Sequence, residues 1–461
     1  NLNWLLIHLL PTVGFILALA LLTHILRERR SPTSTLAWLM TIIFIPYLGV
    51  PLYLIFGGRK MIRRSETKPK LSQDPAKPDW EAQIGNSYWF APGEGIFPPS
   101  PHNQITFLPD GEQAFRAILD LIQKAGSSIH VATFILGKDE TGRAIVQALA
   151  EKASQGLEVR LLLDALGSVR ISKQFLSPLI DAGGRVAFFM PMMHWPLRGR
   201  ANLRNHRKMI ICDHQHAVMG GMNLASEYLG PQTSEGRWQD LSLLVHGPMS
   251  EHLAGIFRSD WKFASNESLG GHATVVQEPP SGADGTTQLI ASGPDVCIDS
   301  LRNAILTSIF RAKRRIWIVT PYFVPDEMML DALCIAAFRN VEVSIIIPHK
   351  SNHRLADLVR EGYLAHVQEA GVDVRLYEPR MLHAKAILID DALAIVGSAN
   401  MDMRSLLLNY EIALCLYDPD AIEQLEVWMS RLKADCTVRE LRTKRAFGLL
   451  ESVGRLFAPL L

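Results

Sequence analysis

The stretch His206-Arg-Lys208-Met-Ile-Ile-Cys-Asp213 returns in the second half of the chain as His383-Ala-Lys385-Ala-Ile-Leu-Ile-Asp390. Seven residues after each aspartate a further pattern begins, Gly220-Gly221-Met-Asn223 in the first copy and Gly397-Ser398-Ala-Asn400 in the second. A single H-x-K-x4-D pattern would carry little weight, because three residues often match by chance. Two copies with the same downstream glycine and asparagine indicate a duplicated unit that brings polar side chains to a common site.

Each motif enters a short apolar strand, expected at 209–212 in the first copy and at 386–389 in the second. Side chains two apart on a strand share a face, so the histidine and the lysine of each motif point the same way. The motif aspartates, Asp213 and Asp390, lie at the strand ends, five residues after the lysines, so their side chains are expected on the other face of the strand. We group them with the catalytic motif, although their place favours holding the turn or the sheet over touching a substrate.

The residues after each motif favour a binding site for phosphate. A second strand returns the chain at 217–220 or 393–397, and its glycines let the backbone come close to a ligand. The asparagines can then place amide donors beside the lysine ammonium groups. If the two copies pack about a pseudo-twofold axis, two histidines, two lysines and two asparagines surround one phosphate. We assign phosphate binding to Gly221, Asn223, Ser398 and Asn400.

Each motif histidine also requires an acceptor that orients its second ring nitrogen. Each copy offers one at the start of a similar downstream strand: Asp240 precedes 241–245, and Glu411 precedes 412–417. Along the chain, Asp240 follows His206 and Glu411 follows His383. We expect these two carboxylates to orient the histidines; the alternative is that they cap strand ends.

Helix and strand patterns alternate around both motifs. The first copy predicts a helix from the N-cap Asp110 to Gly126, a strand at Ile129–Leu136, a helix at Thr141–Ser154 and a strand at Leu157–Leu163. The second copy predicts a helix at Ser300–Ala312, a strand at Ile316–Phe323, a helix at Glu327–Arg339 and a strand at Val341–Ile347. This alternation is typical of α/β folds with helices on the sheet faces, and we expect two pseudo-twofold-related lobes of mixed sheet.

The N-terminal region carries two apolar runs, from Trp4 to Leu26 and from Leu36 to Phe56, each followed by basic residues. Each run has about 20 residues, which is enough to cross a bilayer as a helix. A cleaved signal peptide followed by a buried core helix is the alternative. Basic residues after the second run favour a catalytic body on the cytoplasmic side, although Pro46, Gly49 and Pro51 leave a re-entrant hairpin open.

These patterns divide the chain into five parts. We expect a membrane anchor of two transmembrane helices at 1–60, a linker or collar at 61–104, a first lobe at 105–275, a second lobe at 276–435 and an amphipathic tail at 436–461. The tail repeats apolar residues at helical spacing after Phe447, with basic residues upstream. It fits a helix docked on the second lobe or a helix lying in the headgroup plane of a membrane.

Composition excludes several classes of function. Lys and Arg total 47 against 46 Asp and Glu, so no chain-wide positive field favours nucleic acid. Five cysteines lie far apart without a C-x-x-C pair, which argues against a zinc site or a disulfide framework. We therefore expect no metal and no cofactor.

Other polar residues carry weaker signals. Other histidines have no repeated counterpart and are expected to be structural, among them His130, His194, His214, His246, His349, His353 and His366. His194 lies in an apolar loop followed by the basic run Arg198, Arg200, Arg204 and Arg207. That run is either a solvated charged face or part of a loop that dips toward anionic headgroups.

The paired motifs resemble those of the phospholipase D superfamily, and within it the chain is similar to the bacterial cardiolipin synthases. Matching features besides the two apolar runs are Asn205-His206-Arg-Lys208, Trp238-Gln-Asp240, Thr320-Pro-Tyr-Phe-Val-Pro325 and Asn400-Met-Asp-Met-Arg-Ser405. The resemblance covers nearly the whole chain, and neither motif departs from the family pattern.

The resemblance implies metal-independent transfer of a phosphatidyl group through a covalent phosphohistidine. One phosphatidylglycerol would donate the group and a second would accept it, giving cardiolipin and glycerol. The resemblance assigns the nucleophile to His206 and the acid/base role to His383, while Lys208 and Lys385 stabilise phosphoryl charge. The residues themselves do not decide which histidine attacks.

The implied partners are phosphatidylglycerol and the lipid bilayer, without nucleic acid; a homo-oligomer stays open. The implied location is the bacterial inner membrane, crossed more than once, with the catalytic body in the cytoplasm. A phospholipase D-type hydrolase or another phosphatidyltransferase would use the same motif residues. A nuclease of the superfamily and an inactive membrane scaffold are disfavoured by the neutral charge and by the two intact motifs.

Overall fold

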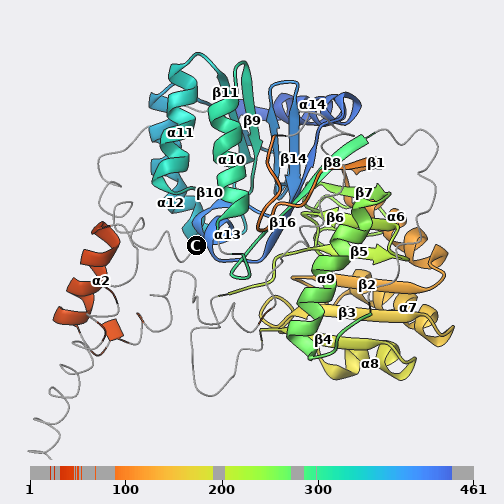
Figure 1. Ribbon diagram of the computed structural model, residues 1–461. Helices are drawn as coiled ribbons and strands as arrows, with labels where there is room; N and C mark the ends of the chain where they lie inside the picture. Colours follow the sequence, from red (N-terminus) through yellow and green to blue (C-terminus); the bar gives the residue numbers. More distant parts are fainter. Residues whose placement is uncertain are drawn as a thin grey trace, which may run out of the picture.

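The computed structural model describes residues 32–45, 89–190, 203–270, 285–296 and 298–438, together with the single residues Leu21, Ile25, Tyr47, Gly49, Val50, Tyr53 and Lys68. The strands of the duplicated unit form two sheets, one in each half of the folded body (Figure 1). The strand order of the first sheet recurs in the second, which has β17 (Cys436–Val438) as an additional edge strand. Each sheet, together with the helices that pack on it, is called a lobe below.

The sheet of the first lobe has the order β1-β7-β6-β5-β2-β3-β4. Its strands are β1 (Ser100–Leu108), β2 (Ser128–Thr133), β3 (Glu158–Asp164), β4 (Arg185–Phe189), β5 (Met209–Cys212), β6 (His216–Gly220) and β7 (Ser242–His246). Strands β2, β3 and β4 run parallel, whereas β2 pairs antiparallel with β5. The sheet is therefore mixed, as the sequence predicts.

The second lobe repeats this arrangement as β8-β16-β14-β13-β9-β11-β12-β17. Its strands are β8 (Gly285–Ser292), β9 (Arg315–Val319), β11 (Glu342–Pro348), β12 (Asp373–Tyr377), β13 (Ala386–Ile389), β14 (Leu393–Gly397), β16 (Glu411–Leu416) and β17 (Cys436–Val438). The short strands β10 (Phe323–Val324) and β15 (Met401–Asp402) pair separately. The expected strand at 316–323 is thus divided in two, since Pro321 interrupts it.

The two sheets meet through β1, which pairs with β7 on one side and with β8 on the other. In the described part of the chain this contact makes one ladder of 15 strands. Trp89 also packs against the core of the second lobe, and Phe97 donates its backbone N–H to Leu289. The predicted linker boundary at residue 104 is therefore wrong: residues 89–104 belong to the folded body.

Helices cover the outer faces of both sheets (Figure 1). The first lobe carries α6 (Gly111–Lys124), α7 (Glu140–Ser154) and α8 (Lys173–Asp181), and the second carries α10 (Ser300–Arg311), α11 (Glu327–Phe338) and α12 (Arg354–Glu369). The expected N-cap of the first helix is confirmed, because the Asp110 side chain accepts a hydrogen bond of 2.8 Å from the Gln113 backbone. The remaining helices are α9 (Met249–Ser265), α13 (Met403–Leu407) and α14 (Pro419–Ala434).

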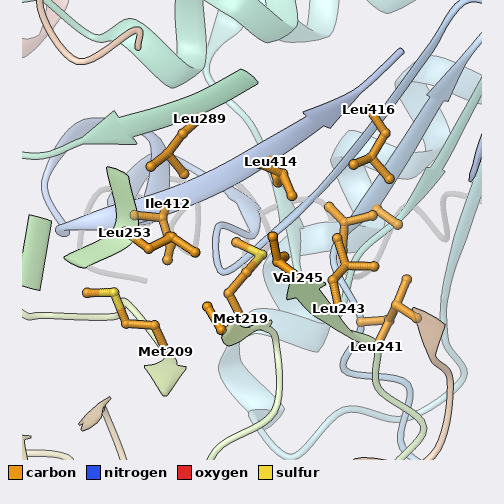
Figure 2. Close-up of a cluster of buried hydrophobic side chains, with 14 of the residues drawn as sticks. Met209, Met219, Leu241, Leu243, Val245, Leu253, Leu289, Ile412, Leu414 and Leu416 are labelled. Atoms are coloured by element: carbon orange, nitrogen blue, oxygen red, sulfur yellow. The ribbon is translucent and has the colours of Figure 1, made fainter. Parts of the chain in front are cut away.

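The inner faces of the two sheets share one apolar core (Figure 2). Met219 and Val245 of the first lobe and Ile412 and Leu414 of the second belong to this cluster, and β14 lies against β6 and β7. Alternate residues on the same strands, such as Val218, face separate clusters under the outer helices. Because both faces are buried, the strands are continuous apolar runs, and the shared core fixes the lobes against each other.

The ends of the chain are described only in part. Strand β17 shows that residues 436–438 belong to the sheet rather than to the expected tail, and the rest of that tail lies outside the described residues. Near the N-terminus, α2 (Pro32–Phe44) overlaps the start of the second apolar run, and Ile25 of the first run packs with Ile42, Val50 and Tyr53. Within the residues that the structure describes, no helix has the length and apolar character needed to cross a bilayer.

Candidate active site

The two motifs meet where the lobes exchange backbone hydrogen bonds. The N–H of His206 donates to the carbonyl of Tyr410 at 2.9 Å, and the N–H of His383 donates to the carbonyl of Gln239 at 2.7 Å. In the other direction, Tyr410 donates to Arg204 at 2.9 Å. Each contact has its counterpart with the lobes interchanged, which is the pattern of an approximate twofold axis.

This exchange gives each histidine an acceptor from the opposite lobe. Nδ1 of His383 is hydrogen-bonded to Oδ2 of Asp240 at 2.7 Å, and Nδ1 of His206 lies 3.2 Å from Oε1 of Glu411. Both carboxylates are fully buried. The sequence places one acceptor in each copy, which suggests that each histidine pairs with the carboxylate of its own copy. That pairing is wrong. The residue before each carboxylate binds the backbone of the histidine in the other lobe, so each carboxylate faces that histidine instead.

Gly221 and Ser398 lie beside these carboxylates. The Ser398 hydroxyl donates to Oε2 of Glu411. At the equivalent place in the first lobe, a Cβ on Gly221 would lie 2.1 Å from Oδ1 of Asp240, so only glycine leaves room for that carboxylate. These contacts favour a role for the two residues in supporting the acceptors, and their assignment to phosphate binding stays a prediction.

The two motif lysines are buried beside the histidines. Nζ of Lys208 donates to the carbonyl of His206 at 2.7 Å. Nζ of Lys385 donates to the carbonyl of His383 and lies 2.7 Å from Nδ1 and 3.1 Å from Nε2 of that ring. Burial lowers the pKa of Lys208 to about 8 and the pKa of Lys385 to about 7, against the opposing fields of both carboxylates. At neutral pH the lysines of the free site are therefore protonated only in part.

The histidines are neutral in the free site. Burial and then the charge of Lys385 lower the pKa of His383 to about 3, although Asp240 opposes them. Burial and then Lys208 also lower the pKa of His206, against the opposing effect of Glu411. A neutral imidazole whose Nδ1 faces a carboxylate presents Nε2 as a base or nucleophile.

The motif asparagines flank the two halves of the site. The Asn223 side-chain oxygen accepts a hydrogen bond of 3.1 Å from the Ile135 backbone, which fixes the direction of its NH2 group. Asn400 follows β14 in the equivalent place and is buried. These positions suit the expected role of donating to phosphoryl oxygens.

The motif aspartates serve the turns at the other end of the strands. Asp213 accepts hydrogen bonds from the backbone N–H groups of residues 126–128 at 2.8–2.9 Å. Asp390 does the same for residues 313–315 at 2.8–3.0 Å. Both have positive φ, 53° and 51°, which aspartate tolerates better than most residues. The two aspartates therefore hold turns, as their position at the strand ends favours, and we no longer group them with the catalytic residues.

Aromatic side chains form the walls of the site, and of these the sequence singles out only Trp238, as part of a family motif. The ring of Phe134 lies 4.2 Å from that of His206, centroid to centroid. Tyr228 and Trp238 lie 5.1 and 5.4 Å from His383. Phe134 directly follows β2, whose end lies beside the motif strand β5. Its position after a strand that pairs with the motif strand is the signal that could have identified it.

The basic run after His194 is divided by the structure. Arg204 and Arg207 are fully buried, so neither a solvated face nor a membrane-dipping loop describes them. His194, Arg198 and Arg200 lie outside the described residues. Among the histidines expected to be structural, His130 pairs with Glu158 at 2.9 Å. No cluster of three or more metal-ligating side chains occurs among the described residues.

Sequence comparison places these features in a known context. Residues 118–261 and 305–433 match the family model described as "Cardiolipin synthase, PLD-like domain", and residues 16–58 match "Phospholipase_D-nuclease N-terminal". The chain is 34% identical to the Major cardiolipin synthase ClsA of Bacillus subtilis over 98% of this chain and 99% of the relative. It is 35% identical to a cardiolipin synthase of Geobacillus thermodenitrificans, over 94% and 90% of the two chains.

A solved structure shares the fold. The phosphatidylserine synthase of Haemophilus influenzae Rd KW20 superposes with a TM-score of 0.59 over 87% of this chain and 98% of that one, at 16% sequence identity. At that identity the likeness concerns the fold alone.

The turn role of the motif aspartates predicts a loss of stability rather than of chemistry. Asp390→Ala leaves three backbone N–H groups without their acceptor, so we expect the free energy of unfolding to fall by about 1–3 kcal/mol. Turnover per folded molecule should stay within a few-fold of wild type. Asp391→Ala, which removes a half-exposed partner of Arg314, is the matched control and should change stability by less than about 1 kcal/mol. A large loss of turnover in folded Asp390→Ala would contradict the turn role.

The exchanged acceptors predict which histidine each carboxylate controls. Asp240→Asn should lower kcat by about a hundredfold or more, because His383 loses its orienting anion. It should also change the rate at which diethyl pyrocarbonate modifies His383, measured by peptide mass spectrometry, and leave His206 unchanged. Glu411→Gln should give the converse pattern. Modification altered at His206 rather than His383 in Asp240→Asn would show that the acceptors are not exchanged.

The lowered lysine pKa values predict an alkaline limb in kcat/KM. Deprotonation of Lys385 and then Lys208 removes the positive charge that holds a phosphate, so kcat/KM should fall as the pH rises through 7 to 8. The corresponding decrease in kcat should occur at higher pH, since a bound phosphate anion stabilises both ammonium groups. A kcat/KM that is constant up to pH 9 would contradict the pKa values of the free site.

Proposed function

Because the chain belongs to the family of cardiolipin synthases with phospholipase D-like domains, we propose that it transfers a phosphatidyl group between two phosphatidylglycerol molecules. The products are cardiolipin and glycerol. The observation that carries the proposal is the pair of carboxylate-oriented histidines, one from each motif, beside two buried lysines. This is an arrangement for cleaving and remaking one phosphodiester at a single phosphorus atom.

The first half of the proposed reaction forms a covalent intermediate. Nε2 of His206 attacks the phosphorus of the first lipid, and the bond from phosphorus to the headgroup glycerol oxygen breaks. That oxygen takes a proton from Nε2 of His383, and glycerol leaves. The bound phosphate anion raises the pKa of the neighbouring basic groups, so substrate binding itself brings the required proton to the site.

The second half reverses these steps with a different alcohol. A hydroxyl of the second phosphatidylglycerol gives its proton to Nε2 of His383 and attacks the phosphorus. The bond from phosphorus to His206 breaks, and both imidazoles return to their starting state. One phosphodiester replaces another, so the reaction needs no nucleotide or other source of energy.

The lysines and asparagines stabilise the pentacoordinate transition states. Lys208 and Lys385 approach the site from opposite lobes, and both experience the fields of Asp240 and Glu411. With two ammonium groups and two carboxylates, the free pocket has little net charge. The phosphoryl oxygens gain most from these donors as negative charge builds on them, which favours the transition state over the ground state.

We further propose that the N-terminal region holds the body at the bacterial cell membrane, with the two lobes on the cytoplasmic side. The exposed apolar side chains of α2, among them Leu36, Met40 and Phe44, support this placement. So does the match of residues 16–58 to an N-terminal family model. The donor lipid then lies within reach of the site without leaving the bilayer.

The products formed from phosphatidylglycerol alone test the proposal. The purified full-length chain should yield cardiolipin and glycerol in equal amounts, identified by mass spectrometry. Phosphatidic acid and glycerol would instead show a hydrolase. His206→Ala and His383→Ala should each lower cardiolipin formation by about a thousandfold or more, because each half supplies a different histidine. His349→Ala, which removes a partly exposed histidine paired with Glu378, is the control and should retain activity.

A further inference from the structure

A lysine from the segment before the body is buried directly beneath the first motif. Lys68 has no exposed side-chain surface, although the 20 residues 69–88 separate it in sequence from Trp89, where the continuous description of the body begins. Its ammonium group forms ion pairs with Asp260 and, at 2.6 Å, with Asp295. A lysine is rarely buried unless it is paired, so this placement requires a specific reason.

The two carboxylates come from different lobes and share a second cation. Asp260 lies on α9 of the first lobe, and Asp295 follows β8 of the second. Arg207 Nη1 contacts Asp260 at 2.7 Å, and its Nη2 lies 3.5 Å from Asp295. Two cations and two anions, all without exposed side-chain surface, make a neutral cluster that crosses the lobe boundary.

The cluster is built into the motif itself. Arg207 is the residue between His206 and Lys208, and its backbone N–H donates to the Asn205 side chain at 3.0 Å. That side chain in turn donates to Asp260 at 3.0 Å. Arg207 also places Nε 3.4 Å from the carbonyl of Glu411, the acceptor residue of His206. The cluster therefore reaches the backbone next to His206 through the Asn205 side chain, and it reaches the carbonyl of the acceptor residue Glu411 through Arg207.

Tyr410 provides a second connection to the site. Its carbonyl accepts the hydrogen bond from the His206 backbone, and its ring lies 4.6 Å from Nζ of Lys68 and 5.3 Å from the guanidinium of Arg207. The negative face of an aromatic ring attracts cations at these distances. Lys68 thus contacts the residue that aligns His206 as well as the carboxylates that hold Arg207.

We propose that Lys68 is a positioning residue for the transfer reaction, which supplies the second positive charge that keeps Arg207, and with it His206, in place. The proposal rests on the proposed function for the reaction that it supports. Without Lys68, one guanidinium faces two buried carboxylates, and an unpaired buried charge is strongly unfavourable. Because Lys68 precedes the body in sequence, the segment that leads from the membrane region contributes a group to the interior of the catalytic centre.

Charge, not volume, is the property that the proposal assigns to Lys68. Burial alone would raise the pKa of Asp295, but Lys68 and Arg207 hold that pKa below its usual range. Lys68→Met keeps most of the side-chain volume and removes the charge. Lys68→Met/Asp295→Asn removes one charge of each sign, which leaves Arg207 paired with Asp260. Comparison of these two variants separates charge balance from packing.

The test measures glycerol release from phosphatidylglycerol by the full-length chain. We expect Lys68→Met to lower kcat by about ten- to a hundredfold with KM within threefold, because a small displacement of His206 slows chemistry more than binding. Lys68→Arg and the double variant should recover kcat to within about fivefold of wild type. Lys124→Met, which removes an exposed lysine paired with Asp120 in the same helix, is the control and should match wild type.

Chemical modification supplies a readout that does not depend on turnover. Lys68→Met should increase the rate at which diethyl pyrocarbonate modifies His206 and leave His383 unchanged, and the double variant should restore the wild-type rate. Wild-type kcat and His206 reactivity in Lys68→Met would overturn the proposal, as would a double variant no better than the single one. Glycerol release also accompanies hydrolysis, so a wild-type chain that makes phosphatidic acid would refute only the proposed function.

Discussion

The active site depends on two histidine–carboxylate contacts that cross from one lobe to the other. Asp240 of the first lobe binds His383 of the second, and Glu411 of the second lies against His206 of the first. Neither lobe alone contains a motif histidine together with its acceptor. The shared core between the sheets and the backbone bonds beside each carboxylate fix this exchange. Docking of the lobes and assembly of the catalytic centre are therefore one event.

Burial of so many ionisable groups is tolerable because each charge has a partner. Asp240 keeps its pKa below the usual range, since Lys385 and His383 outweigh the effect of burial. Deeper in the junction, Arg207 and Lys68 balance two aspartates. Such networks contribute little net stability, because the desolvation of each ion offsets its attraction. What they provide is a fixed geometry for groups that act on a phosphate.

Local patterns predicted the repeat and the motif strands, and they singled out the histidines and lysines to which we assign the proposed chemistry. Those features depend on neighbours along the chain, as the N-cap Asp110 and the strand parity of Asp213 illustrate. The partner of each carboxylate, the place of Ser398 and the burial of Lys68 depend instead on how distant segments pack. A sequence in which Asp240 follows His206 gives no sign that the carboxylate belongs to His383. Duplication conceals the exchange, because both pairings contain the same residue types.

The two halves of the site are not equal, and the differences support different roles for the histidines. Asp240 gives one oxygen to His383 at 2.7 Å and the other to the Leu241 backbone. Glu411 also accepts from Ser398 and Asn409, and its contact with His206 is longer, at 3.2 Å. The His206 side chain is 20% exposed, against 10% for His383. An imidazole that must bond to phosphorus and then release it benefits from greater exposure to the substrate and from a weaker contact with its carboxylate. A ring that exchanges protons with two successive alcohols benefits from a strong, fixed acceptor, so the asymmetry supports His206 as nucleophile and His383 as acid and base.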